Sequence, residues 1–194
     1  FLMYIFALPL ILEMNYILKL WLSKPPEMAV IFTRLALIDV VIASVSYQIM
    51  TLAQATGKIK LYQSVVGGIL LLNLPVSYIV LKLGASAYSV MIVAIVISIV
   101  ATIIRLLILR LLVSFSIKKF LRDCILPIFS VVLIASVIPC FLHYIMEENF
   151  FRLCIVFISA IFLTLLSIIT FGLSHGERKV IFINIKNKIL GNNK

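Results

Sequence analysis

The stretch Ile125–Ile145 reads ILPIFSVVLIASVIPCFLHYI, and it decides the fold class because it contains no charged residue. A second stretch, LCIVFISAIFLTLLSIITFGLSH at Leu153–His175, is equally free of Asp, Glu, Lys and Arg. A helix of about 20 apolar residues matches the roughly 30 Å hydrocarbon thickness of a bilayer. Both stretches therefore predict membrane-spanning helices and argue against a soluble enzyme.

The rest of the chain has the same character. Hydrophobic residues make up 64% of its 194 residues and charged residues only 12%. The sequence therefore predicts an all-α, polytopic membrane protein with about six transmembrane helices. The expected apolar segments cover residues 1–18, 28–54, 61–83, 86–112, 124–145 and 151–171.

The basic residues predict the topology. The formal net charge is +10, which in a soluble protein would suggest a nucleic-acid partner. In a membrane protein, Lys and Arg collect in the cytoplasmic loops, so no nucleic-acid partner is expected. The rule places the loop around Gly57, the basic loop 114–123 and the basic tail 172–194 in the cytoplasm. Residues 180–190 of the tail are expected to form a short amphipathic helix on the membrane surface.

Signals of soluble chemistry are missing from the sequence. The three cysteines have no CxxC or Cys/His spacing and are expected to be buried packing residues. No Walker A, HExxH or GxSxG motif occurs. We therefore predict no enzyme activity, no cofactor and no metal site.

The second segment carries an unusual polar load, namely Arg34, Asp39 and Gln48. Ionisable residues inside a membrane helix are costly and usually face a cavity, a partner or a pathway. A spacing of five separates Arg34 and Asp39 by roughly 140° on an ideal helix, so they are not expected to pair. Arg34 and Gln48 share a face and either line an aqueous cavity for an anionic or sugar-bearing substrate or play structural roles.

Three further positions are candidates. Pro75 removes a backbone donor and frees the carbonyl of Leu71, so the stretch around Asn73 and Pro75 is either a functional helix break or an ordinary kink. Arg105 either lines a cavity or extends to the membrane surface. Glu13 is either a proton or cation site or an interfacial residue. A stripe of small residues on the fourth segment predicts close helix packing: Ala87, Ala94, Ser98, Ala101 and Thr102.

Several short motifs carry a family resemblance. They are LKLWL at Leu18–Leu22 followed by Pro25 and Pro26, FTRL at Phe32–Leu35, AQATGKIKLYQ at Ala53–Gln63, and LNLPVSY at Leu72–Tyr78. The region resembles the C-terminal portion of the Wzx-type polysaccharide biosynthesis proteins. These are flippases for O-antigen and capsule precursors within the multidrug/oligosaccharidyl-lipid/polysaccharide transporter superfamily.

The resemblance implies a fourteen-helix, two-lobe transporter. Residues 1–113 would then be a partial second lobe of four helices, and residues 124–171 two extra C-terminal helices. We expect the chain to begin partway through a longer protein, whose N-terminal lobe would be a partner of this part.

The implied activity is the flipping of undecaprenyl-diphosphate-linked oligosaccharide across the bacterial inner membrane by alternating access. Membrane lipids are further expected partners, with a proton or sodium as a possible coupling ion. Arg34 is the residue that the resemblance carries over as a substrate contact.

Three alternatives remain open. A cation-coupled multidrug exporter would share the fold, and cavity carboxylates would favour it. A membrane glycan polymerase or ligase would need larger outward loops than the one near residues 143–150. A non-transporting scaffold is the third alternative.

Overall fold

The computed structural model describes residues 1–22, 24–55, 57, 59–113 and 116–173, with only the backbone described at positions 59, 61 and 113. The surface helix expected at 180–190, and the basic tail from residue 174 on, lie outside the described residues. Within these ranges every regular element is a helix, in agreement with the all-α prediction.

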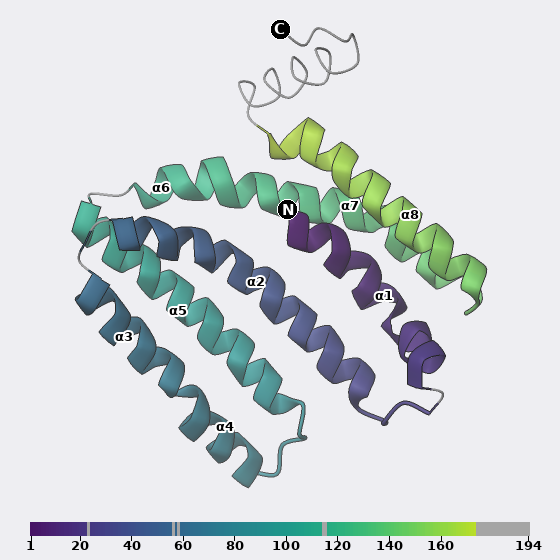
Figure 1. Ribbon diagram of the computed structural model, residues 1–194, viewed down its shortest axis with the longest axis horizontal. Coiled ribbons are helices and arrows are strands. Elements are labelled where there is room, and N and C mark those ends of the chain that lie inside the picture. Colours follow the sequence, from purple (N-terminus) through teal and green to yellow (C-terminus); the bar gives the residue numbers. More distant parts are fainter. Residues whose placement is uncertain (23, 56, 58, 114–115, 174–194) are drawn as a thin grey trace, which may run out of the picture. The chain divides into compact units, whose positions relative to one another are not determined.

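Six helical stretches of the described residues are long and apolar enough to cross a membrane, as the hydropathy predicts. The first two spans are α1 (Leu2–Leu22) and α2 (Ala29–Ala55). The other four each extend over one or more helices of Figure 1: Tyr62–Lys82, Ser89–Leu112, Ile117–Ile145 and Phe150–Gly172.

The chain divides into two compact units, with the boundary between Lys119 and Phe120. In the unit Leu2–Lys119, α1 packs on α2, α2 packs on α5 (Ser89–Val113), and α5 packs on α3 and α4. Figure 1 shows these helices side by side in the order α1, α2, α5 and then α3 with α4. Segments distant in sequence, such as α2 and α5, are therefore direct neighbours.

Small side chains bring α2 and α5 together. Ala53 and Ala101 are completely buried, and Ser46 is nearly so. The hydroxyl groups of Ser46 and Thr102 form a short hydrogen bond between the two helices. The close packing predicted for the small residues of the fourth segment is thus confirmed at Ala101 and Thr102, whereas Ala87 is exposed.

The third span is interrupted at Leu72, between α3 (Ile59–Leu71) and α4 (Asn73–Lys82). The Leu72 amide bonds to the carbonyl of Ile69 at 3.1 Å, a tighter turn than an α-helix makes. Pro75 follows in the first turn of α4, where its missing N–H is tolerated. The interruption divides the span into two helices joined through Leu72, whose backbone is hydrogen-bonded to both of them.

The second unit contains the last two spans. Helix α7 (Leu126–Ile145) packs against α8 (Phe150–Ser167) and the π-helical turn η2 (Ile168–Gly172). The Asn149 side chain accepts a hydrogen bond from the Arg152 amide at 2.7 Å and caps α8. The Arg152 guanidinium donates to the Met146 carbonyl at 3.1 Å. These bonds fix the turn that joins the two helices.

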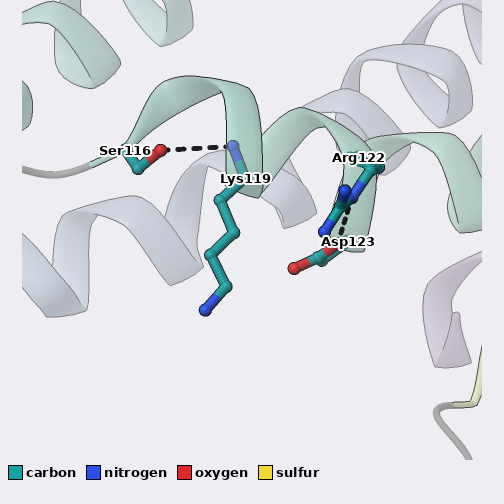
Figure 2. Close-up of polar contacts among 4 residues, drawn as sticks. All are labelled: Ser116, Lys119, Arg122 and Asp123. Carbon is teal, nitrogen blue, oxygen red and sulfur yellow. Dashed lines mark hydrogen bonds and ion pairs between the residues drawn. The ribbon is translucent and has the colours of Figure 1, made fainter.

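The prediction of a loop across residues 114–123 is wrong from Ile117 onward. This segment forms α6 (Ile117–Phe120) and the π-helical turn η1 (Leu121–Ile125), which leads directly into α7. Ser116 begins the helix by accepting a hydrogen bond from the Lys119 amide at 3.4 Å, as Figure 2 shows. No glycine or proline interrupts the segment before Pro127. The basic residues therefore extend a helix instead of forming a loop.

The same segment holds an exposed ion pair. Arg122 Nε lies 3.1 Å from Asp123 Oδ1 (Figure 2).

The wide π-helical turn η1 comes just before Pro127. In a regular helix the ring of a proline clashes with the carbonyl four residues earlier. A π-helical turn is a way to accommodate such a clash without ending the helix.

Candidate functional site

Arg34 joins α2 to α1. Its Nε donates to the carbonyl of Ile11 at 2.8 Å, and its Nη2 donates to the carbonyl of Leu12 at 3.3 Å. The side chain is half-buried. A guanidinium has five N–H donors, and these two bonds engage two of them. Arg34 is thus held against the backbone of another span, and it retains donor capacity for a further ligand.

Glu13 lies one residue beyond these carbonyls and is completely buried, with no exposed surface. The interfacial alternative placed this carboxyl at the membrane surface, whereas the structure encloses it between packed helices. The sequence indicates that Glu13 is unusual, because it is a lone carboxylate within an apolar segment. The sequence left Glu13 open as a proton or cation site, and its complete burial is compatible with that alternative.

Asp39 and Gln48 lie elsewhere on α2. Asp39 is half-buried, and its Oδ1 is shielded from solvent with no hydrogen-bond partner among the described residues. Gln48 is exposed. It lies about 21 Å along the helix axis from Arg34, at 1.5 Å per residue. The structure therefore does not bring Arg34 and Gln48 into one cluster, although they share a side of the helix.

Tyr62 and Arg105 form a second polar contact, between α3 and α5. Tyr62 is only 2% exposed, and the charge of Arg105 acts on its hydroxyl group at close range. Within the described part of the chain, the Tyr62 hydroxyl and Arg105 Nε are both shielded from solvent and lack hydrogen-bond partners. Sequence reasoning singled out Arg105 but missed Tyr62, because no local pattern links residues so far apart in the chain.

Asn73 makes a local contact. Its Oδ1 accepts a hydrogen bond from the Ser77 hydroxyl at 3.2 Å, one turn further along α4. Pro75 lies between them and is exposed. The Asn73 side chain therefore supports the start of α4, directly after the interruption at Leu72.

The cysteines differ from the expectation. Cys124 and Cys140 are exposed and Cys154 is half-buried, and all three are free thiols. The prediction of buried packing residues is thus wrong for the first two. Both lie on helices of the two-span unit, whose surface is apolar enough for a small thiol to face lipid. Across the described ranges, no group of three or more His, Cys, Asp or Glu side chains is placed to hold a metal ion.

The two arginines of these spans therefore take part in two separate contacts, Arg34 at α1–α2 and Arg105 at α3–α5. Comparison with known proteins adds no identification: no family model, curated protein or solved structure matches the chain.

Proposed function

We propose that this chain is part of a transporter that flips polyprenyl-diphosphate-linked oligosaccharide across the bacterial inner membrane. In this proposal it works by alternating access, with its C-terminus in the cytoplasm. The resemblance of residues 18–78 to Wzx-type flippases is the reason for proposing this substrate. The six apolar helices support the membrane location in general terms.

The observation that carries the proposal is the placement of two arginines within apolar spans. Arg34 is anchored to α1 and retains unengaged N–H groups, and Arg105 has a buried Nε without a partner among the described residues. Cations at such positions are costly unless an anion or a polar path uses them. A diphosphate would be attracted strongly there because the surrounding dielectric constant is low.

The interrupted third span supports a transport mechanism. Broken helices in transporters allow one part of a span to move against another and place backbone polar groups near a cavity. The turn at Leu72, followed by Pro75, provides such a point between α3 and α4. In this proposal the further lobe that the resemblance implies completes the cavity, and a proton or sodium ion supplies the driving force.

A cation-coupled multidrug exporter is the second candidate. Asp39 has a carboxylate oxygen that is shielded from solvent without a hydrogen-bond partner in the described part of the chain. The completely buried Glu13 adds a second carboxyl group in the same unit. Carboxylates within spans suit cationic drugs and coupling ions better than they suit a diphosphate.

The pool of lipid-linked oligosaccharide tests the proposal. Cells lacking the full-length gene are expected to accumulate complete, unpolymerised lipid-linked repeat units and to lose surface polysaccharide. An unchanged pool with altered sensitivity to cationic drugs would contradict the flippase and favour the exporter.

Complementation with variants tests the role of Arg34. We expect Arg34→Ala to lower export about tenfold, the effect of losing about 1.4 kcal/mol of binding, while membrane insertion stays normal. Arg110→Ala is the matched control because Arg110 is exposed at the end of α5. Normal export by Arg34→Ala would remove Arg34 from the site.

A further inference from the structure

Two polar side chains, Tyr62 and Arg105, meet between α3 and α5. Tyr62 has only 2% of its surface exposed, and the charge of the Arg105 guanidinium acts on its hydroxyl group. Neither the Tyr62 hydroxyl nor Arg105 Nε has a partner among the residues that the structure describes. Buried polar groups are nearly always satisfied, so this pair requires an explanation.

The chemistry of the two groups identifies what is missing. A guanidinium only donates hydrogen bonds, whereas a phenol both donates and accepts. A direct bond from Arg105 to Tyr62 would still leave the phenolic O–H without an acceptor. A single anionic oxygen can accept from both groups, and it would also neutralise the arginine charge. The site is therefore suited to an anion with several oxygens.

The position of Tyr62 and Arg105 indicates which class of anion fits the site. Tyr62 lies in the first turn of α3, where helix N–H groups favour negative charge. Lys60 and Arg110 are exposed near the same ends of α3 and α5. Basic pockets between transmembrane helices near the membrane surface bind phosphate head groups.

We propose that Tyr62 and Arg105 form a binding site for a phosphate group, supplied either by an anionic lipid head group or by free phosphate. Tyr62 donates its O–H to one phosphate oxygen, and Arg105 donates through Nε and carries the compensating charge. The site is distinct from the Arg34 contact. It shares Arg105 with the proposed diphosphate path but rests on the Tyr62–Arg105 contact, so it can be tested without any measurement of flipping.

The experiment measures ligand binding to the intact 194-residue chain purified in a neutral detergent. Native mass spectrometry counts bound dioctanoyl phosphatidylglycerol, with dioctanoylglycerol as the lipid that lacks phosphate. A second arm titrates inorganic phosphate and records the midpoint temperature of thermal unfolding. This temperature rises if the folded state binds the anion. The variants are Tyr62→Phe and Arg105→Gln. The matched controls are Tyr78→Phe and Lys82→Gln, because both replaced side chains are exposed and lie on α4, away from the Tyr62–Arg105 contact.

We expect Tyr62→Phe and Arg105→Gln each to weaken phosphatidylglycerol binding about tenfold, as loss of a hydrogen bond to a charged group does. The controls and dioctanoylglycerol binding should be unchanged. A response to inorganic phosphate alone, lost in both variants, would support the site with free phosphate as its ligand. Unchanged binding of both phosphate ligands in Tyr62→Phe would overturn the proposal. That variant keeps the ring and is checked for wild-type helicity by circular dichroism.

Discussion

At the residue scale, the polar side chains inside the spans act through partners on other helices. Arg34 contacts backbone carbonyls of α1, and Ser46 contacts Thr102 of α5. Residue type and helical spacing identify Arg34 as exceptional. They cannot identify its partners, because a backbone carbonyl has no signature in the sequence.

The contact of Arg34 predicts a stability effect separate from any effect on transport. Arg34→Gln removes two charge-assisted hydrogen bonds between α1 and α2 and should lower the free energy of unfolding by about 1–2 kcal/mol. Unfolding by sodium dodecyl sulfate in mixed micelles measures this change. Arg110→Gln serves as the control, and an equal loss in both variants would argue against a specific role for the α1 carbonyls.

The Ser46–Thr102 bond predicts a coupling energy. Interhelical hydrogen bonds in membranes contribute about 0.6 kcal/mol on average and up to about 1.7 kcal/mol. A double-mutant cycle with Ser46→Ala and Thr102→Val should give a favourable coupling in this range. Strictly additive effects of the two substitutions would mean that the hydroxyl groups do not interact in the membrane.

At the scale of elements, the boundaries of the six spans follow from hydropathy to within a few residues. Hydropathy did not predict the helix that begins at Ile117, because the basic residues of the segment 114–123 suggested a loop. Charge does not break a helix, however, and no glycine or proline intervenes before Pro127. Ser116 supplies a helix cap instead. The interruption near Pro75 has a local cause that the sequence makes visible, since proline lacks an amide donor.

The cap at Ser116 predicts local fraying. Ser116→Ala should weaken the start of α6 by about 0.5–1 kcal/mol and increase amide exchange at Lys119 about twofold to fivefold. Hydrogen exchange with mass spectrometry measures this change, and Lys118→Ala is the control because it is exposed and its side chain is outside the cap. Unchanged exchange at Lys119 would show that the hydroxyl does not cap the helix.

At the scale of the whole molecule, the order α1, α2, α5 and then α3 with α4 could not be predicted from the sequence. The apolar residues of these segments are not confined to one side of each helix, so hydrophobic periodicity does not indicate which helices become neighbours. Small residues on α5 were the one usable signal, and they do meet α2. The Tyr62–Arg105 contact depends on this order and was missed for the same reason.

The central claim is that the six apolar helices of the described residues are membrane spans, and the charge pattern predicts that the basic segments face the cytoplasm. Single-cysteine variants at Lys119 and Glu148, in a background without the native cysteines, test it with a membrane-impermeant maleimide. Both positions are exposed and lie at opposite ends of the span Ile117–Ile145. We predict labelling of Glu148→Cys in spheroplasts and labelling of Lys119→Cys only after the membrane is permeabilised. Labelling of both positions in intact spheroplasts would contradict the account.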